Sequence, residues 1–234
     1  MPKFRPPFVL LLTLLCLCAG PATEPPGKTA PPFDIKALLG DPPADGSDAQ
    51  KAEIATMLKL QENRTHDEVV RCEAEVEMSP YEFGEPVIGA WFTGKGLPLT
   101  NALFIKVSRQ TAVVTGAAKI IWQRNRPYIT DPRIKPCVDL EKSFSYPSGH
   151  ATRGVVWASI LAELFPEKRD ALMAHGHQYG TDRTLAGMHY PSDVAAGQKL
   201  AAEIVKRMLA DPDMQASIAK AKAECAAADH GAKK

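Results

Sequence analysis

Apolar residues recur at intervals of three and four along most of the chain, and no segment alternates between apolar and polar residues as a strand would. Residues on one face of a helix have this spacing, whereas one face of a strand repeats every second residue. Two segments show the helical pattern most clearly, with apolar positions at Leu99, Leu103, Val107, Val113, Val114, Ala117, Ala118 and Ile121, and at Val155, Val156, Ile160 and Leu164. The pattern predicts an all-α protein built as a helical bundle.

Prolines and helix-capping residues set the expected ends of the helices. Asp48 is expected to cap the first helix, while Arg126-Pro127 and Pro166 are expected to end the two central ones. Residues 84–98 have the composition of a loop. The expected helices cover residues 48–70, 99–124, 148–165, 167–179, 191–209 and 212–228.

The start of the chain has the layout of a secretory signal peptide. Lys3 and Arg5 precede an apolar run over residues 8–18, and small residues follow that run. We therefore expect residues 1–22 to be removed on export, and the mature protein to be soluble and either periplasmic or secreted. No later run approaches the roughly 18 apolar residues of a membrane span. Two cysteines at the end of the apolar run leave a lipoprotein anchor as an alternative, although a leucine precedes each of them.

A proline-rich segment follows the expected signal peptide. Seven prolines lie between Pro21 and Pro43, and such a composition resists regular structure. We expect residues 23–46 to form an extended linker and residues 47–234 to form one folded domain.

Charge and cysteine content narrow the classes of partner. The chain has 28 basic and 27 acidic residues, which gives no basic surface for nucleic acid, so any recognition of anions must be local. Cys72, Cys137 and Cys225 remain after export, and in an oxidising compartment any two of them could pair. Since no Cys-x-x-Cys pair indicates a metal site, we expect at most one disulfide and no metal or other cofactor.

Polar residues with chemical potential gather in three clusters at predicted helix ends. The clusters are Lys119 with Arg126-Pro127, then Pro147-Ser148-Gly149-His150, and finally Arg183 with His189 and Asp193. A phosphoryl group in transfer carries negative charge, so its site needs fixed cations, backbone N–H donors, a nucleophile and a proton source. The three clusters contain each of these parts, which indicates phosphoryl chemistry.

Each residue type suits one part of that chemistry. Lys119 offers a point charge, whereas Arg126 and Arg183 offer planar groups that bind two phosphate oxygens at once. Ser148 and Gly149 lie where the start of a helix presents N–H groups to an anion.

Two histidines complete the expected machinery. His189 and Asp193 are four residues apart at a helix start, so the carboxylate can orient the imidazole and leave Nε2 free to attack phosphorus. His150 would then protonate the leaving oxygen and later activate water.

The order and spacing of the three clusters resemble the three-part motif of the type 2 phosphatidic acid phosphatase superfamily. The segments Ser-Tyr-Pro-Ser-Gly-His-Ala-Thr and His-Tyr-Pro-Ser-Asp-Val are most similar to those of the bacterial class A non-specific acid phosphatases. The resemblance covers about residues 47–228 and implies the helical fold of acid phosphatases and vanadium-dependent haloperoxidases. It also implies a phosphohistidine intermediate, broad hydrolysis of phosphate monoesters, and inhibition by oxyanions such as vanadate.

The resemblance assigns the same roles to the residues as their chemistry does. Phosphate binding falls to Lys119, Arg126, Ser148, Gly149 and Arg183, proton donation to His150, nucleophilic attack to His189, and orientation to Asp193. One departure is Asp182, which stands where the family usually has a serine; its carboxylate could repel substrate or brace Arg183.

Several alternatives stay open at the level of sequence. The same motif serves lipid phosphate and isoprenoid pyrophosphate phosphatases and vanadate-dependent haloperoxidases, and an inactive phosphate-binding protein would also retain it. Three aromatic residues, Tyr81, Trp91 and Phe92, could stack on a leaving group or simply anchor a loop. The sequence also leaves open whether the protein forms a homo-oligomer.

Overall fold

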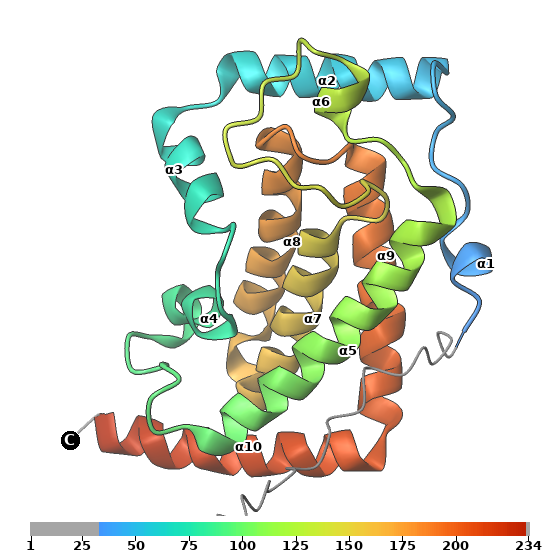
Figure 1. Ribbon diagram of the computed structural model, residues 1–234. Coiled ribbons are helices and arrows are strands. Elements are labelled where there is room, and N and C mark those ends of the chain that lie inside the picture. The colour runs from blue at the N-terminus through green and yellow to red at the C-terminus, as the bar shows by residue number, and fades with distance from the viewer. Residues whose placement is uncertain (1–32, 233–234) are drawn as a thin grey trace, which may run out of the picture. The chain divides into compact units, whose positions relative to one another are not determined.

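The computed structural model describes residues 33–232, which contain helices and no strand (Figure 1). The all-α prediction is confirmed. The helices are α1 (Ile35–Leu39), α2 (Asp48–Asn63), α3 (His66–Ala74), α4 (Pro80–Ile88), α5 (Pro98–Trp122), α6 (Pro127–Thr130), α7 (Gly149–Leu164), α8 (Arg169–Leu185), α9 (Pro191–Ala210) and α10 (Pro212–Ala232), with a 3-10 turn at Pro166–Lys168.

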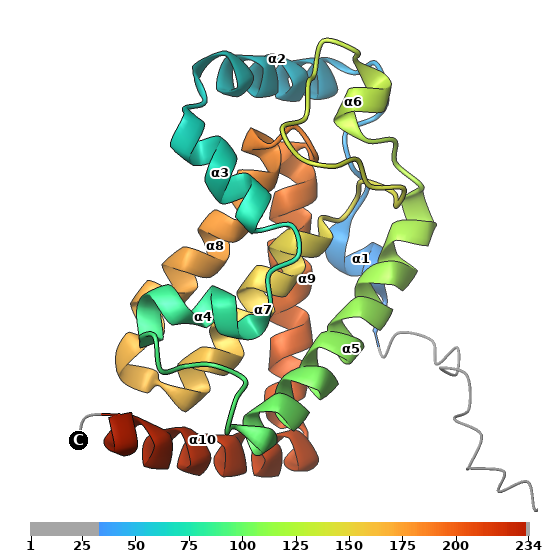
Figure 2. The same cartoon turned by 60° about the vertical axis from the view of Figure 1, so that its left-hand side comes forward.

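Helix α7 is the centre of the bundle. It packs most extensively against α8 and α9, and 12 of its 16 residues are buried. Helix α5 crosses this group diagonally, α2 lies across one end and α10 lies across the other (Figure 1). The view turned by 60° shows the same layering (Figure 2). Because α7 is covered on several sides, its first turn is held firmly at the α2 end of the bundle.

Glycines allow the backbones of α7, α8 and α9 to approach closely. A Cβ atom on Gly176 of α8 would lie 2.7 Å from the carbonyl oxygen of Gly154 in α7. A Cβ atom on Gly197 of α9 would lie 2.5 Å from the carbonyl oxygen of Ser148. Both distances are far below van der Waals contact, so no side chain fits at these positions without moving a helix.

The folded region begins earlier than the sequence predicted. Residues 33–46 were expected to belong to an extended linker, yet α1 forms within them and Ile35 is only 3% exposed. The prolines flank this short helix and do not interrupt it, and the Asp34 side chain accepts a hydrogen bond from Ala37 N (2.9 Å) at its start. The Tyr146 hydroxyl donates to the carbonyl oxygen of Gly40 (3.1 Å) and ties the segment to the bundle. The expected signal peptide lies outside the described residues.

Two capping boxes explain the differences in helix boundaries at α3 and α4. The helix expected over residues 48–70 is broken, because Thr65 starts α3 by exchanging hydrogen bonds with Glu68. Ser79 and Glu82 start α4 in the same way, so the first third of the segment expected as a loop is helical. Helix α8 also continues six residues beyond the expected end at Tyr179. The Ser/Thr-x-x-Glu signal was present in the sequence in both cases and was missed.

The aromatic residues before α5 anchor the core and do not line a phosphate site. The rings of Tyr81 and Phe92 are 5.0 Å apart, and Phe92 also packs on Phe165 at 5.6 Å. The Tyr81 hydroxyl donates to Asn101 near the start of α5 (2.7 Å). Lys119 lies about 27 Å further along that helix, given a rise of 1.5 Å per residue. Stacking of these aromatic residues on a leaving group is therefore excluded.

Within the described region, Cys72, Cys137 and Cys225 are all free thiols, so none of the three possible pairings is formed. Burial raises the pKa of Cys72 to about 12, which keeps this thiol protonated. None of the helices between residues 33 and 232 is long and apolar enough to cross a membrane.

The glycine contacts predict a specific loss of stability. Gly176→Ala should lower the free energy of unfolding by about 1–3 kcal/mol, because its Cβ atom must push α8 away from α7. Gly116→Ala is the control, since nothing lies within 4 Å of a Cβ atom there and alanine favours a helix. Urea unfolding of both variants checks the prediction, and an equal midpoint for the two would contradict it.

Candidate active site

The three polar clusters meet at the α2 end of the bundle. Lys119 lies near the end of α5, Ser148 caps the start of α7, and Asp193 lies in the first turn of α9. A Cβ atom on Gly149 would lie 3.8 Å from Cε of Lys119, and Ser148 N donates to the carbonyl oxygen of Asp193 (2.9 Å). The structure thus brings all eight residues singled out in the sequence to one end of the fold. The loop of residues 131–148 lies at this same end (Figure 1).

His189 is completely buried and has one nitrogen directed at a cation. Its Nε2 lies 2.9 Å from Arg126 Nη1, and its Nδ1 lies 3.4 Å from Asp193 Oδ2. A guanidinium nitrogen can only donate, so Nε2 must accept and the ring proton lies on Nδ1, facing the carboxylate. Burial, together with the positive charge of Arg126, holds the pKa of His189 well below its ordinary value of 6.5. The imidazole is therefore neutral, with the lone pair of Nε2 directed at the arginine.

Asp193 is fixed by a network that the sequence analysis missed. Its Oδ1 accepts from Arg124 Nη1 (2.6 Å), and its Oδ2 accepts from Tyr190 N (2.9 Å) and from the Ser145 hydroxyl. Arg124 also pairs with Glu53 of α2 (3.0 Å). These partners are remote from Asp193 in the sequence, apart from Tyr190, so no spacing signalled them.

Lys119, Arg126 and Arg183 surround the buried end of α7, and we call these three residues the cation cradle. Arg126 and Arg183 are each 1% exposed. Burial, with the positive charge of Arg126, lowers the pKa of Lys119 to about 7. The Lys119 ammonium donates to the carbonyl oxygens of Phe144 and Ser145.

One acidic residue, Glu141, lies within the cation cradle. Its Oε2 accepts from Arg126 Nη2 (2.6 Å) and its Oε1 accepts from Arg183 Nη2 (2.8 Å). The Nε and Nη1 atoms of Arg183 are buried and have no hydrogen-bond partner within the described part of the chain. The cradle therefore holds one carboxylate and retains further donors for an anion.

His150 lies next to the cradle in the first turn of α7. Its Nδ1 is 3.8 Å from Glu141 Oε1, and its Nε2 is 3.4 Å from the carbonyl oxygen of Val76. Burial and the charge of Arg183 hold its pKa well below 6.5. A proton donor at this position is thus neutral at pH 7 and becomes charged only in acid.

Asp182 is neutralised by a residue of α3. Its carboxylate accepts two hydrogen bonds from Arg71, from Nε to Oδ2 (2.7 Å) and from Nη2 to Oδ1 (3.1 Å). Arg71 therefore balances the charge that replaces the expected serine hydroxyl, and the pair links α3 to α8.

Among residues 33–232, no group of three or more His, Cys, Asp or Glu side chains could hold a metal ion.

Comparison with known proteins finds phosphatases among the relatives of this chain. Residues 98–212 match the PAP2 superfamily. The chain is 34% identical over 144 residues to a non-specific acid phosphatase of Salmonella typhimurium. This match covers 59% of this chain and 58% of that protein. It is 31% identical over 133 residues to a decaprenylphosphoryl-5-phosphoribose phosphatase of Mycobacterium tuberculosis, covering 52% of this chain and 71% of that protein.

A solved structure supports the fold. The crystal structure of a transmembrane PAP2 type phosphatidylglycerolphosphate phosphatase from Bacillus subtilis has a TM-score of 0.55 with this chain. The match covers 74% of this chain and 89% of that one at 21% sequence identity. At this level of identity the similarity concerns the helical architecture alone.

The network around Asp193 predicts a large effect of Arg124 on stability. Arg124→Ala leaves the buried Asp193 and the half-buried Glu53 without their counter-ion and should lower the free energy of unfolding by about 3–5 kcal/mol. Arg133→Ala is the control, because Arg133 is exposed and its ion pair within residues 33–232 is with Asp131, two positions earlier in the chain. Urea unfolding measures both, and a loss no larger for Arg124→Ala than for the control would show that the network is not needed.

Proposed function

The chain belongs to the PAP2 superfamily, and on that premise we propose that it is an acid phosphatase that hydrolyses phosphate monoesters without a metal or cofactor. One observation carries the proposal: the buried His189 presents an unprotonated Nε2 to the cation cradle. A nucleophile and the charges that bind its anionic target are thus already adjacent.

In the first half-reaction the cradle and the N–H groups at the start of α7 bind the phosphate group. His189 Nε2 attacks phosphorus, and the bond from phosphorus to the ester oxygen breaks. His150 gives its proton to that oxygen, so the alcohol leaves neutral. The proton on His189 Nδ1 stays directed at Asp193, whose negative charge stabilises the phosphorylated imidazole.

In the second half-reaction water replaces the alcohol. His150, now unprotonated, takes a proton from water as the oxygen attacks phosphorus and the bond to His189 breaks. Inorganic phosphate leaves, and both histidines return to their starting states. Vanadate should inhibit the reaction, because it can bind in the same cradle and adopt the geometry of the transferring phosphoryl group.

The natural substrates and the location of the protein are also proposals. The name of the Salmonella relative supports broad hydrolysis of soluble monoesters, and the signal-like residues 1–22 support export to the periplasm or medium. The Mycobacterium tuberculosis relative favours a second candidate, a lipid phosphate phosphatase. A comparison of substrates distinguishes these two candidate functions. Hydrolysis of a short soluble monoester at a rate far above that of a polyprenyl phosphate in detergent supports the first.

The mechanism predicts different effects of the two histidines. With p-nitrophenyl phosphate and EDTA, His189→Ala should lose at least about 10³-fold in kcat, because the phosphohistidine cannot form. His150→Ala should lose about 10²–10⁴-fold on alkyl phosphates but less on p-nitrophenyl phosphate, whose leaving group needs less help from an acid.

The exposed His177 of α8 provides the control, and His177→Ala should hydrolyse both substrates like the wild type. Loss of wild-type activity in EDTA would contradict the metal-free mechanism. Phosphate binding without turnover would instead support a phosphate-binding protein, and bromide oxidation with vanadate and peroxide would support a haloperoxidase.

The pKa shifts predict an acidic optimum for kcat/KM. This ratio reports the free protein, in which the pKa values of both His150 and His189 lie well below 6.5. Activity needs protonated His150, so it should fall as pH rises through the pKa of that residue. It also needs neutral His189, so it should fall as pH drops through the pKa of the nucleophile. A pH–rate profile measures both limbs, and an optimum above pH 7 would contradict the assignment.

A further inference from the structure

All the hydrogen-bond donors of Arg126 are already in use in this structure. A guanidinium group has five N–H bonds. The Nε atom donates to Ser143 O (2.9 Å), Nη1 to Met188 O (3.0 Å) and His189 Nε2 (2.9 Å), and Nη2 to Glu141 Oε2 (2.6 Å) and Ser143 Oγ (2.9 Å). An incoming phosphate oxygen can therefore bind Arg126 only by replacing one of these acceptors.

Glu141 is the acceptor that an anion would replace. The backbone carbonyl groups of Ser143 and Met188 are parts of the fold, and the Ser143 hydroxyl is uncharged. His189 Nε2 gives up its hydrogen bond only when it attacks phosphorus. The Glu141 side chain is 31% exposed, whereas the side chains of the two arginines that it bridges are each 1% exposed. It carries a negative charge, and its two oxygens contact Arg126 and Arg183 as two oxygens of a phosphate would.

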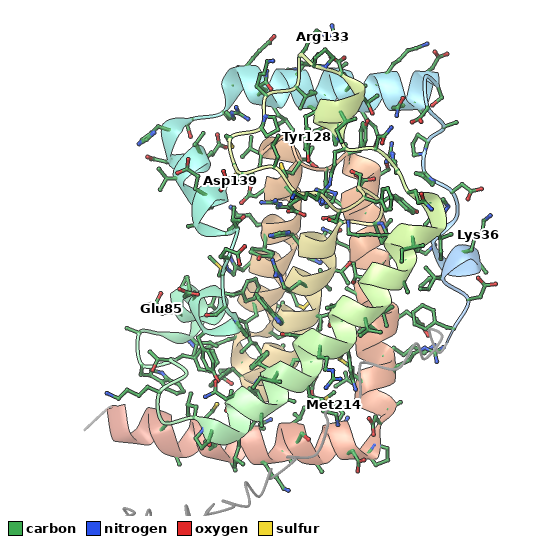
Figure 3. All side chains as sticks on the ribbon, in the orientation of Figure 1. Lys36, Glu85, Tyr128, Arg133, Asp139 and Met214 are labelled. Carbon is green, nitrogen blue, oxygen red and sulfur yellow. The ribbon has the colours of Figure 1, made fainter. Side chains whose placement is uncertain are left out.

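The Glu141 side chain can leave without unfolding the loop that carries it. The Tyr128 hydroxyl, whose residue is labelled in Figure 3, donates to the backbone oxygen of Glu141 (2.9 Å). Arg126 Nε binds the backbone of Ser143 two residues later. Since the backbone is held at Glu141 itself and again two residues later, rotation of the side chain into solvent is enough to free both arginines.

We propose that Glu141 occupies the phosphate position of the free protein as an internal anion, which substrate and product phosphate must displace. This inference rests on the proposed function. The carboxylate neutralises the two buried guanidinium groups when no substrate is bound, and its return to the arginines helps product phosphate to leave. Burial acts to raise the pKa of Glu141, but Arg126 and the neighbouring cations lower it to about 2, so the carboxylate remains charged in acid.

The test is the affinity of Glu141→Gln for inorganic phosphate, measured by isothermal titration calorimetry on the full chain. Glutamine keeps the size of the side chain and removes its charge. The variant should bind phosphate about tenfold more tightly, because phosphate no longer competes with an anion for the two arginines. The KM for p-nitrophenyl phosphate should fall in parallel.

Asp139→Asn is the matched control. Asp139 is an exposed carboxylate on the same loop, and it lies toward α3 (Figure 3). Its substitution removes the same charge, so unchanged phosphate affinity in this variant shows that the effect of Glu141 is local. An equal gain in affinity for Asp139→Asn would overturn the proposal, since a change of overall charge would then explain both.

A purely structural role for Glu141 predicts a different phosphate affinity for the variant. If the carboxylate only held the two arginines in position, Glu141→Gln would bind phosphate equally well or more weakly, and that outcome overturns the proposal. Should Glu141→Gln fail to fold, Glu141→Asp keeps the charge but reaches less far, and it should still bind phosphate more tightly than the wild type. A wild-type protein that does not hydrolyse phosphate monoesters would contradict the proposed function itself, whatever the phosphate affinities of the variants.

Discussion

The constraint on which the rest of this molecule depends is the burial of positive charge at one end of a helical bundle. Arg124, Arg126 and Arg183 are at most 5% exposed. A buried charge costs several kcal/mol of lost hydration unless a partner compensates it. The partners come from distant parts of the chain: Glu53 in α2, Glu141 in the loop before α7, and Asp193 in α9. The need to neutralise three guanidinium groups therefore draws α2, this loop and α9 to the same place.

The same buried charges decide the chemistry of the site. His150 and His189 have lowered pKa values because they are buried among cations. Neither imidazole carries a charge at neutral pH. In the proposed mechanism this leaves His189 free to attack phosphorus, whereas His150 needs acid to become charged. In the proposed mechanism, the preference for acid thus follows from the burial of the two histidines and then from the arginines beside them. Close helix packing supports this arrangement, because Gly197 lets α9 touch the start of α7 at Ser148.

Sequence reasoning succeeded where the signal was local. The long apolar periods located α5, α7 and α9, and the spacing of three polar clusters identified residues that the fold brings together. It failed at α4 and at the break before α3, where short capping boxes outweighed weak periodicity. It also missed Arg124 and Glu141. The carboxylates that pair with Arg124 and the arginines that pair with Glu141 are 15 to 71 residues away in the chain. Such contacts are formed by tertiary packing and leave no regular spacing to detect.

Asp193 serves two purposes with one carboxylate. Its Oδ2 faces the ring of His189 and also accepts the backbone N–H of Tyr190 at the start of α9. An orphan N–H group at a helix start must be satisfied for the helix to begin there. The residue that we propose orients the nucleophile is therefore also part of the signal that starts a 20-residue helix. During evolution the two functions cannot separate easily. A descendant that abandoned catalysis would still be selected to keep an acceptor at this position. An intact Asp193 in a homologue is therefore evidence of a preserved fold before it is evidence of a preserved activity.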